Sequence, residues 1–479
     1  MGSEPIGITI HEVRWGYEHF AYRTPIKFGG QAFDRVTVLN VCCRVRSRSG
    51  SEVWGFGSMP LGNVWAFPSR RLTYDRTLTV MQRLADRLGP LFADSTTCGH
   101  AIDLYLEAER HFDSLAKEVG SELNVPEPIP RLAVLVAASP FDAALHDALG
   151  KAYCVSSYAT YEPPYFAQDL SRYLGARGSG LALTTAVARE PVAQLPLYHL
   201  IGALDPVEPA DVSTPVGDGL PEHLAQWIEY NGLTHLKIKL NGDDLQWDLE
   251  RVLRVEHVTA AVQRRRGIAQ WWYSLDFNER CPHGDYLVDF LGRLRSRCPS
   301  AFERVQYIEQ PTTRNLDTQE PGSLASAARY KPLVVDEALT DAASLQRAVA
   351  VGYTGAALKA CKGQTHSLLL AALARQMGLF LCVQDLTCPG ASLIHSAGLA
   401  AHVRGVASLE ANARQYIPQA NRPWEPLFPG LFTIHDGLVR TGRLTGPGLS
   451  ALPGHWSPDE DSPVGRFPWH HMASRSPAL

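Results

Sequence analysis

The sequence is poor in lysine. Of its 45 basic residues only 8 are lysine, and half of these fall in two close pairs, Lys237/Lys239 and Lys359/Lys362. Arginine stays protonated in proteins, whereas a lysine loses its proton when its surroundings lower its pKa. The paired lysines therefore indicate a chemical demand that arginine cannot meet.

Long apolar runs and a strong net charge are also missing. Segments such as 132–138 and 368–374 are far shorter than the roughly 18–20 residues that span a bilayer, so no membrane partner is expected. A net charge of −4 and a pI near 6.5 exclude the basic footprint of a general nucleic-acid binder. The first six residues have neither a basic region nor an apolar region, which predicts no signal peptide.

Paired cysteine motifs are absent as well. The nine cysteines are an odd number, and no two of them form a C-x-x-C pair or stand at zinc-finger spacing. A reduced, cytoplasmic location is the expectation that follows.

The chain length and the changing pattern of apolar segments predict two domains followed by a C-terminal segment. Residues 1–190 begin with strand-like segments at 8–15, 36–45 and 52–57, with a turn at Gly29-Gly30, and continue with helical patterns at 77–88, 101–115 and 140–153. The last helix is predicted to start at Ser139-Pro140, an N-cap residue followed by proline. This region reads as an α+β unit followed by a connection.

From residue 195 to 412, short apolar runs alternate with amphipathic helices. The expected strands are 196–201, 234–240, 271–277, 305–310, 333–337, 356–359, 379–384 and 406–410. The helices between them are expected at 222–230, 247–264, 286–297, 324–330, 341–351, 365–377 and 391–402. Eight such repeats predict an α/β fold, a (β/α)₈ barrel. Residues 413–479 are expected to pack back on the N-terminal unit.

The second barrel strand carries the first lysine pair. Side chains alternate along a strand, so Lys237 and Lys239 share one face while Leu236, Ile238 and Leu240 share the other. The apolar face must meet the surrounding helices, which directs both lysines into the barrel.

The next three strands each end in an acid: Asp276, Glu309 and Asp336. Barrel enzymes place their chemistry at the C-terminal ends of the strands, so these carboxylates should converge. Three buried carboxylates repel one another unless a cation neutralises them. Oxygen-only ligands favour Mg²⁺ over Zn²⁺. Lys359 ends the sixth strand, so a lysine stands on each side of the acids.

The order K-x-K, D-x-N, E-Q-P, D-E, K-x-x-K resembles the enolase superfamily, and within it the muconate-lactonizing-enzyme-like subgroup of the mandelate racemase/muconate lactonizing enzyme family. The segment 141–148 resembles a helix of that family's capping domain. The fold this implies is a modified TIM barrel whose N-terminal capping domain is completed by the C-terminal tail.

The resemblance also implies roles for individual residues. Asp276, Glu309 and Asp336 would bind one Mg²⁺, for which Mn²⁺ can substitute. Lys239 and Lys359 would be acid/base catalysts, and Lys237 would hold the substrate carboxylate. Asn278, Lys362 and Glu337 would support these groups. Such a cluster of cations is also required by the chemistry itself, because a proton α to a carboxylate leaves only if the enediolate charge is stabilised as it forms.

Two opposed lysines favour racemisation or epimerisation of a small carboxylate substrate, since one can remove the proton and the other return it. Cycloisomerisation or syn elimination by a dehydratase needs only one base and remains the alternative. The seventh strand has no histidine of the kind that sugar-acid dehydratases of the family use. Glu410 and Asn412, on one face of the eighth strand, together with Asp385 and Trp65, are the expected substrate contacts. The segments 15–23 and 55–67, rich in glycine and aromatic residues, are expected either to form lids, with Met59 and Trp65 able to touch the substrate, or to anchor a lid by apolar packing.

Two further classes are more distant. A Schiff-base lyase would use Lys359 or Lys239 as nucleophile, and a non-catalytic barrel would use none of these residues. Neither gives the three acids a function. Self-association as a homo-oligomer is left open by the sequence.

Overall fold

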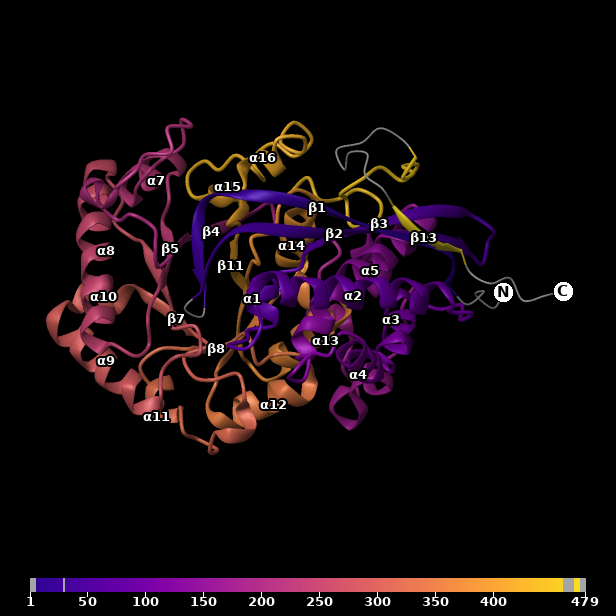
Figure 1. The fold of residues 1–479 in the computed structure, drawn as a ribbon, viewed down its shortest axis with the longest axis horizontal. Helices are drawn as coiled ribbons and strands as arrows, with labels where there is room; N and C mark the ends of the chain where they lie inside the picture. Colours follow the sequence, from indigo (N-terminus) through magenta and orange to yellow (C-terminus); the bar gives the residue numbers. More distant parts are fainter. Residues whose placement is uncertain (1–5, 29–30, 460–468, 474–479) are drawn as a thin grey trace.

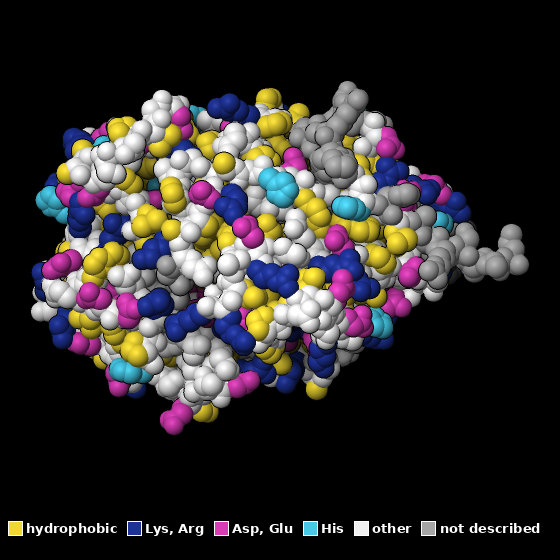
Figure 2. Space-filling view, in the orientation of Figure 1, with side chains coloured by type: hydrophobic (Ala, Val, Ile, Leu, Met, Phe, Trp, Pro, Cys, Tyr) yellow, Lys and Arg dark blue, Asp and Glu magenta, His cyan; other side chains and the backbone are white. Residues whose placement is uncertain are grey.

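The computed structural model describes residues 6–28, 31–459 and 469–473 (Figure 1). The turn expected at Gly29-Gly30 lies outside the described residues, as do residues 1–5, on which the signal-peptide prediction mainly rests. All nine cysteines are free thiols. Basic and acidic side chains are interspersed over the face shown in Figure 2.

Eight parallel strands close into a barrel, because the last of them pairs with the first. The strands are β4 Gln194–Ile201, β5 His235–Lys239, β6 Trp272–Asp276, β7 Val305–Glu309, β8 Leu333–Val335, β9 Gly355–Leu358, β10 Phe380–Val383 and β11 Val406–Glu410. The helices outside them are α7 Leu224–Asn231, α8 Leu245–Arg266, α9 Gly284–Arg297, α10 Pro299–Arg304, α11 Ala325–Ala328, α12 Ala342–Val351, α13 Gln364–Gln376 and α14 Ala391–His402. The predicted fold class is confirmed.

A layer of side chains fills the barrel interior below the mouth. It includes one buried residue from each of the strands β4, β7, β8, β9 and β10: Tyr198, Tyr307, Val334, Ala357 and Cys382. The lower barrel is therefore a packed core rather than a channel, as expected for this architecture. Because this layer fills the barrel interior, the polar side chains gather at the C-terminal ends of the strands.

The N-terminal domain is an antiparallel sheet packed on helices (Figure 1). Its strands are β1 Ile8–Phe28, β2 Gln31–Ser47 and β3 Glu52–Pro60, and its helices are α1 Asn63–Ala66, α2 Tyr74–Ala93, α3 Ala101–Glu109, α4 Phe112–Glu122 and α5 Arg131–Ala152. The strands β1 and β2 extend well beyond the predicted segments and form a long hairpin. The helix predicted over 101–115 is interrupted at Arg110-His111, where α3 ends and α4 begins.

The predicted start of α5 at Ser139-Pro140 is wrong. The helix begins at Arg131 and runs through Pro140. Proline cannot donate to the carbonyl four residues earlier, and here the Ser139 hydroxyl donates to that carbonyl, Val136 O, at 2.8 Å. Ser139, which suggested an N-cap, instead supplies inside the helix the hydrogen bond that Pro140 cannot make.

Helix α5 is long and apolar enough to cross a membrane, but its whole apolar window is buried inside the protein. It packs closely on β3 at Gly55 and Gly57. A Cβ added at Gly57 would lie 1.9 Å from Pro140 O, and one at Gly55 would lie 2.1 Å from Ala144 O. The two glycines let the helix and the strand approach more closely than side chains would allow.

The C-terminal residues contact both domains. The short helices α15 Ala413–Tyr416 and α16 Pro418–Asn421 follow the barrel, and β12 Leu438–Arg440 adds antiparallel to β4. Further on, Leu449 N donates to the buried Asp147 of α5 at 2.7 Å, and β13 His470–Ala473 pairs with β1. The capping-domain sheet therefore contains strands from both ends of the chain.

Three buried histidines predict acid sensitivity. Burial lowers the pKa of His100 to about 3 and that of His395 to about 4, and it lowers that of His199 well below its usual value. Below about pH 6.5 the unfolded chain takes up protons that the folded chain refuses, so the free energy of unfolding should fall as the pH drops from 6.5 towards 4. Each histidine contributes up to about 1.4 kcal/mol per pH unit, measurable by urea denaturation.

His395 is the cleanest test of this effect, because neither of its ring nitrogens has a hydrogen-bond partner. His395→Gln should flatten the slope of stability against pH, whereas His455→Gln, at an exposed position, should leave it unchanged. A slope that is the same in both variants and the wild type would contradict the assignment.

Candidate active site

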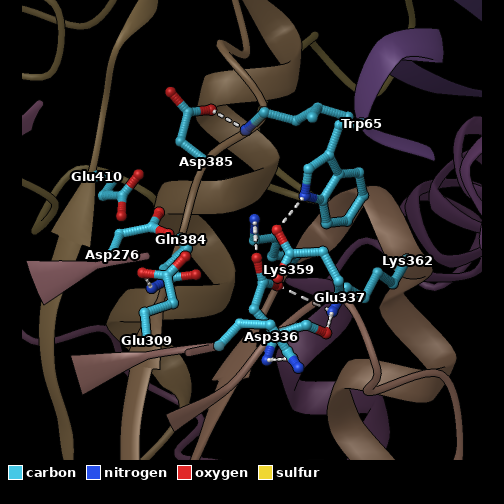
Figure 3. Close-up of polar contacts among 12 residues, drawn as sticks. Trp65, Asp276, Glu309, Asp336, Glu337, Lys359, Lys362, Gln384, Asp385 and Glu410 are labelled. Carbon is cyan, nitrogen blue, oxygen red and sulfur yellow. Dashed lines mark hydrogen bonds and ion pairs between the residues drawn. The ribbon is translucent and has the colours of Figure 1, made fainter. Parts of the chain in front are cut away.

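The residues predicted at the strand ends lie together at the barrel mouth (Figure 3). The carboxylates of Asp276, Glu309 and Asp336 are 0–1% exposed, and Lys237 and Lys359 are 3% and 4% exposed. Both strand-end acids Asp276 and Glu309 are the last residues of their strands, and Asp336 and Lys359 directly follow theirs. Parallel strands in register bring these ends to one level.

Lys237 lies where the carboxylates converge. Its Nζ is 3.1 Å from Asp276 Oδ2, 2.6 Å from Glu309 Oε2 and 2.7 Å from Glu410 Oε1. Burial acts to lower the pKa of Lys237, but the carboxylates, Glu309 first, outweigh it and raise that pKa well above its usual value. The ammonium group is thus held in its charged form by acids from three strands.

Asp276 is held from two sides. Lys239 forms an ion pair with Oδ2, while the backbone and side-chain amides of Asn278 each donate to Oδ1 at 2.9 Å. Although burial acts to raise it, Lys239 and Lys237 lower the pKa of Asp276 below its usual range. Asn278 fixes the rotamer of this carboxylate, the supporting position expected from the D-x-N motif.

Asp336 has a corresponding pair of lysines. Lys359 Nζ lies 2.7 Å from Oδ2 and Lys362 Nζ lies 3.0 Å from Oδ1. Burial opposes the effect, but Lys359 and Lys362 lower the pKa of Asp336 to about 2. The two lysine pairs of the sequence therefore bind two different carboxylates on opposite sides of Glu309.

Glu309 lies between Asp276 and Asp336, and the cations around it do not balance the negative charge of the buried acids. Its pKa is raised well above the usual value by burial and then by Asp276, despite Lys237. Within residues 6–28, 31–459 and 469–473, no group of three or more acidic, histidine or cysteine side chains has its ligand atoms arranged around a common point. The ammonium of Lys237 lies among Asp276, Glu309 and Glu410. In donor type and in charge, the oxygen-only set fits a hard divalent cation.

Trp65 reaches the site from the capping domain. It lies on α1, and its Nε1 donates to Glu337 Oε1 at 3.0 Å (Figure 3). The ammonium of Lys359 lies 4.4 Å from the centre of its ring, and that of Lys239 lies 5.5 Å from the centre of the Phe28 ring. Lys239 and Lys359 thus each lie against an aromatic ring of the capping domain, a favourable cation–π arrangement.

Trp65→Phe should lower the free energy of unfolding by about 1–3 kcal/mol, because it leaves a buried oxygen of Glu337 without its donor. Glu337 is 2% exposed, and its other oxygen already has no hydrogen-bond partner. Urea denaturation measures the change. Trp54→Phe, in a half-buried position of the cap sheet, serves as the control. Equal stabilities of Trp65→Phe and wild type would show that this hydrogen bond is not formed.

The expected substrate contacts Glu410, Asn412 and Asp385 have different hydrogen-bond partners. Asn412 Nδ2 donates to Glu410 Oε2 at 3.2 Å, and Asn412 Oδ1 is buried without a partner. Asp385 instead accepts from backbone amides: Leu386 N and Cys388 N on one oxygen and Asn412 N on the other. Asp385 therefore organises the loop after β10 and positions Asn412.

A cavity of about 730 Å³, part of it open to solvent, joins these groups to the capping domain. Its floor carries Lys237, Lys239, Glu309, Asp336 and Lys359, with Glu410 and Asn412 at one side. Its upper wall comes from the β1–β2 hairpin, α1 and α2: Tyr22, Ile26, Phe28, Phe33, Val36, Trp65 and Tyr74. The acids and lysines of the strand ends thus lie on the barrel side, whereas the capping-domain side is mainly apolar, with Lys27 and Arg35 as its charged residues.

Two corrections concern the capping domain. The segment 15–23, expected as a lid, is part of strand β1, and only its far end at Tyr22 lines the cavity. Met59, a candidate substrate contact on the segment 55–67, is buried in the core of the sheet and does not line the cavity. Burial on β3 explains this, because alternate side chains of that strand face α5.

Two glutamines were not singled out from the sequence. Gln384, the residue after β10, donates to Glu309. Gln310 Oε1 accepts from Asp336 N at 2.9 Å, so it fixes the backbone that carries this acid. The E-Q-P motif contained the signal for Gln310, since the residue after a strand-end ligand is well placed to brace the neighbouring strand.

The family profile described as Enolase C-terminal domain-like matches residues 219–453, which include most of the barrel. Comparison with curated proteins gives no match. Among solved structures, the chain is similar to a dipeptide epimerase from Cytophaga hutchinsonii complexed with Mg and D-Ala-L-Val, with 15% identity, a TM-score of 0.58, and coverage of 92% of this chain and 95% of that one.

Two other solved structures are similar to the same degree. A muconate lactonizing enzyme from Pseudomonas fluorescens has 15% identity and a TM-score of 0.58, covering 93% of this chain and 96% of that one. An N-succinyl Arg/Lys racemase from Bacillus cereus has 15% identity and a TM-score of 0.57, covering 92% and 95%. At such identities the likeness establishes the shared fold.

Proposed function

The barrel of this chain belongs to the enolase superfamily, in its mandelate racemase/muconate lactonizing enzyme group, and on that premise we propose a racemase or epimerase. The reaction is removal and return of the proton α to the carboxylate of a small substrate. Lys239 and Lys359 are the acid/base pair, and Lys237 holds the substrate carboxylate.

One observation carries this proposal. Lys239 ends β5 and Lys359 directly follows β9, and these strands are four apart in a closed ring of eight. The two ammonium groups therefore approach the mouth from opposite sides, with Asp276, Glu309 and Asp336 between them. A substrate α-carbon above those acids has a lysine on each face, as two-base proton transfer requires.

Asp276, Glu309 and Asp336 are the residues that would hold Mg²⁺, or Mn²⁺ in its place. When bound there, a divalent cation supplies electrostatic stabilisation of the negative charge that develops on the substrate carboxylate. The raised pKa of Glu309 supports this assignment, because it reflects a deficit of positive charge among buried acids. Several solved structures of the same fold were determined with Mg.

The side groups of the cavity favour an N-substituted amino acid or a related acid. The unpartnered Oδ1 of Asn412 can accept a hydrogen bond from a substrate N–H group, and Glu410 beside it supplies one negative charge. The aromatic entrance formed by Tyr22, Phe28 and Phe33 suits an apolar substituent. The rings of Phe28 and Trp65 lie against Lys239 and Lys359 and shield the two ammonium groups in part from water.

Cycloisomerisation or syn elimination is the second candidate. It needs a single base, and the other lysine would then serve as a fixed cation beside the enediolate. The ion pairs of Lys359 and Lys362 with Asp336 favour this alternative on that side of the mouth, because they hold both ammonium groups close to a carboxylate.

Incubation of the enzyme with Mg²⁺ and a library of N-acyl amino acids, dipeptides and hydroxy acids in D₂O tests the proposal. A racemase incorporates deuterium at the α-carbon and inverts its configuration, which NMR and polarimetry detect. Turnover that yields an alkene or a lactone without α-exchange would instead establish the second candidate. Trapping of a substrate adduct by borohydride, with indifference to chelator, would establish a Schiff-base enzyme.

A further inference from the structure

A second cavity lies outside the barrel mouth and is lined by residues of α7, of the short helices α15 and α16, and of the segment 432–434. Figure 1 shows α7, α15 and α16 along the same edge of the molecule. The cavity encloses about 880 Å³, part of it open to solvent. None of the residues proposed for catalysis lines it. Its notable component is Arg414, the second residue of α15.

Arg414 is a buried charge without a counter-ion. It is 7% exposed, and no residue in the described part of the chain forms an ion pair with it. Its contacts are to neutral groups: Asn231 Oδ1 accepts from Nη1 at 2.5 Å, His199 Nδ1 accepts from Nη2, and the Trp227 ring centre lies 5.2 Å away. Burial accordingly lowers the pKa of Arg414 to about 9.

The guanidinium group also has unused donors. It carries five N–H bonds, of which the two contacts above use two, and its Nε has no hydrogen-bond partner. Asn421, 1% exposed on the same cavity, has an Nδ2 group that likewise lacks an acceptor. Buried charges and donors left in this state are costly unless an acceptor with negative charge completes them.

The remaining charges of the lining do not supply it. Asp218 is bound by Arg23 through hydrogen bonds of 2.7 and 2.9 Å. Arg422 and Glu425 contribute one charge of each sign, so Arg414 leaves the cavity with a net positive charge. We propose that this cavity binds a small oxyanion, held by the guanidinium group of Arg414 and the side-chain amide of Asn421, independently of the proposed reaction. Trp227, Phe432 and Ile434 provide an apolar wall that favours an organic carboxylate.

Isothermal titration of the full-length protein with acetate, benzoate and inorganic phosphate, at constant ionic strength, tests the site. Saturable binding of one anion per chain is expected, with benzoate tighter than acetate if the apolar wall takes part. Tighter binding of phosphate than of either carboxylate would identify a phosphate site of the same oxyanion class.

Asn231→Asp is the decisive variant. It places a carboxylate on the guanidinium group at the position where Asn231 Oδ1 now accepts, so the chain supplies its own counter-ion. Anion affinity should fall at least about tenfold, the equivalent of one charge-assisted hydrogen bond. The substitution also removes the hydrogen bond that Asn231 Nδ2 donates to Ile434 O at 3.2 Å, so the melting temperature of the variant without anion is measured as the control for the fold. Arg414→Met should also lose binding, and Arg443→Gln, an exposed arginine elsewhere, should retain it.

Lys239→Met separates this cavity from the barrel mouth. Binding that persists in Lys239→Met and is lost in Asn231→Asp supports the proposal. Binding that is lost in Lys239→Met alone assigns the anion to the catalytic lysines and overturns it. Equal affinity in Asn231→Asp and wild type, or no saturable binding of any of the three anions, also overturns it.

Discussion

Asp276→Asn should reduce turnover at least about a thousandfold while leaving the fold intact. The substitution removes a negative charge that two lysines contact and that the proposed divalent cation would share. Electrostatic stabilisation of a developing enediolate is worth several kcal/mol, and about 4 kcal/mol corresponds to a thousandfold in rate. The shape of the side chain is kept, so its packing against Asn278 survives.

Activity alone does not identify the cause, so the variant should also be titrated with Mg²⁺ by calorimetry. Loss of Mg²⁺ binding together with a melting temperature near that of the wild type is the expected pair of results. Asp289→Asn, in a surface ion pair with Arg293, is the matched control and should behave as wild type. Full turnover by wild-type enzyme after exhaustive treatment with EDTA would rule out the metal.

The two lysines should give opposite defects. Lys239→Met should abolish deuterium exchange from one enantiomer of the substrate, and Lys359→Met from the other, because each lysine serves one face of the α-carbon. Loss of a positioned base costs about 10²–10⁴-fold in rate. Exchange is measured by NMR in D₂O, starting separately from each pure enantiomer.

The enantiomer from which exchange is lost, rather than the size of the loss, distinguishes two-base racemisation from one-base reactions. Lys331→Met, a partly exposed lysine away from the site, should exchange both enantiomers normally. If both lysine variants lose exchange from the same enantiomer and leave the other untouched, the two groups do not lie on opposite faces. A product that forms through one lysine only would favour cycloisomerisation or elimination.

Most of the barrel was predictable because its strands are short apolar runs bounded by polar turns. Each of the eight predicted strands overlaps an observed one, with ends that differ by at most two residues. The acids and lysines could be read in the same way, since a strand that ends in a buried acid has few structural reasons to do so. Glu337 and Asn278 followed from their places beside those acids.

The rest depended on contacts between distant parts of the chain. Nothing local indicates that Trp65 donates to Glu337, because 272 residues separate them. The interior of α5 was misread because Ser139-Pro140 has the local chemistry of a helix start, whereas the helix continues through the proline with the Ser139 hydroxyl on Val136 O and with close packing against β3. Burial of nearly the whole of α5 stabilises the helix more than the Ser139-Pro140 sequence destabilises it.

The sheet that contains both β1 and β13 has a consequence for how the protein is made. Its first strand, β1, precedes the barrel along the chain, and its last strand, β13, follows the barrel and pairs with β1. The barrel, whose eight strands follow one another along the chain, can be complete before then. Nascent chains should therefore carry a finished barrel beside an open-edged cap, and the fourth strand of the cap can be added only after β13 itself has been synthesised.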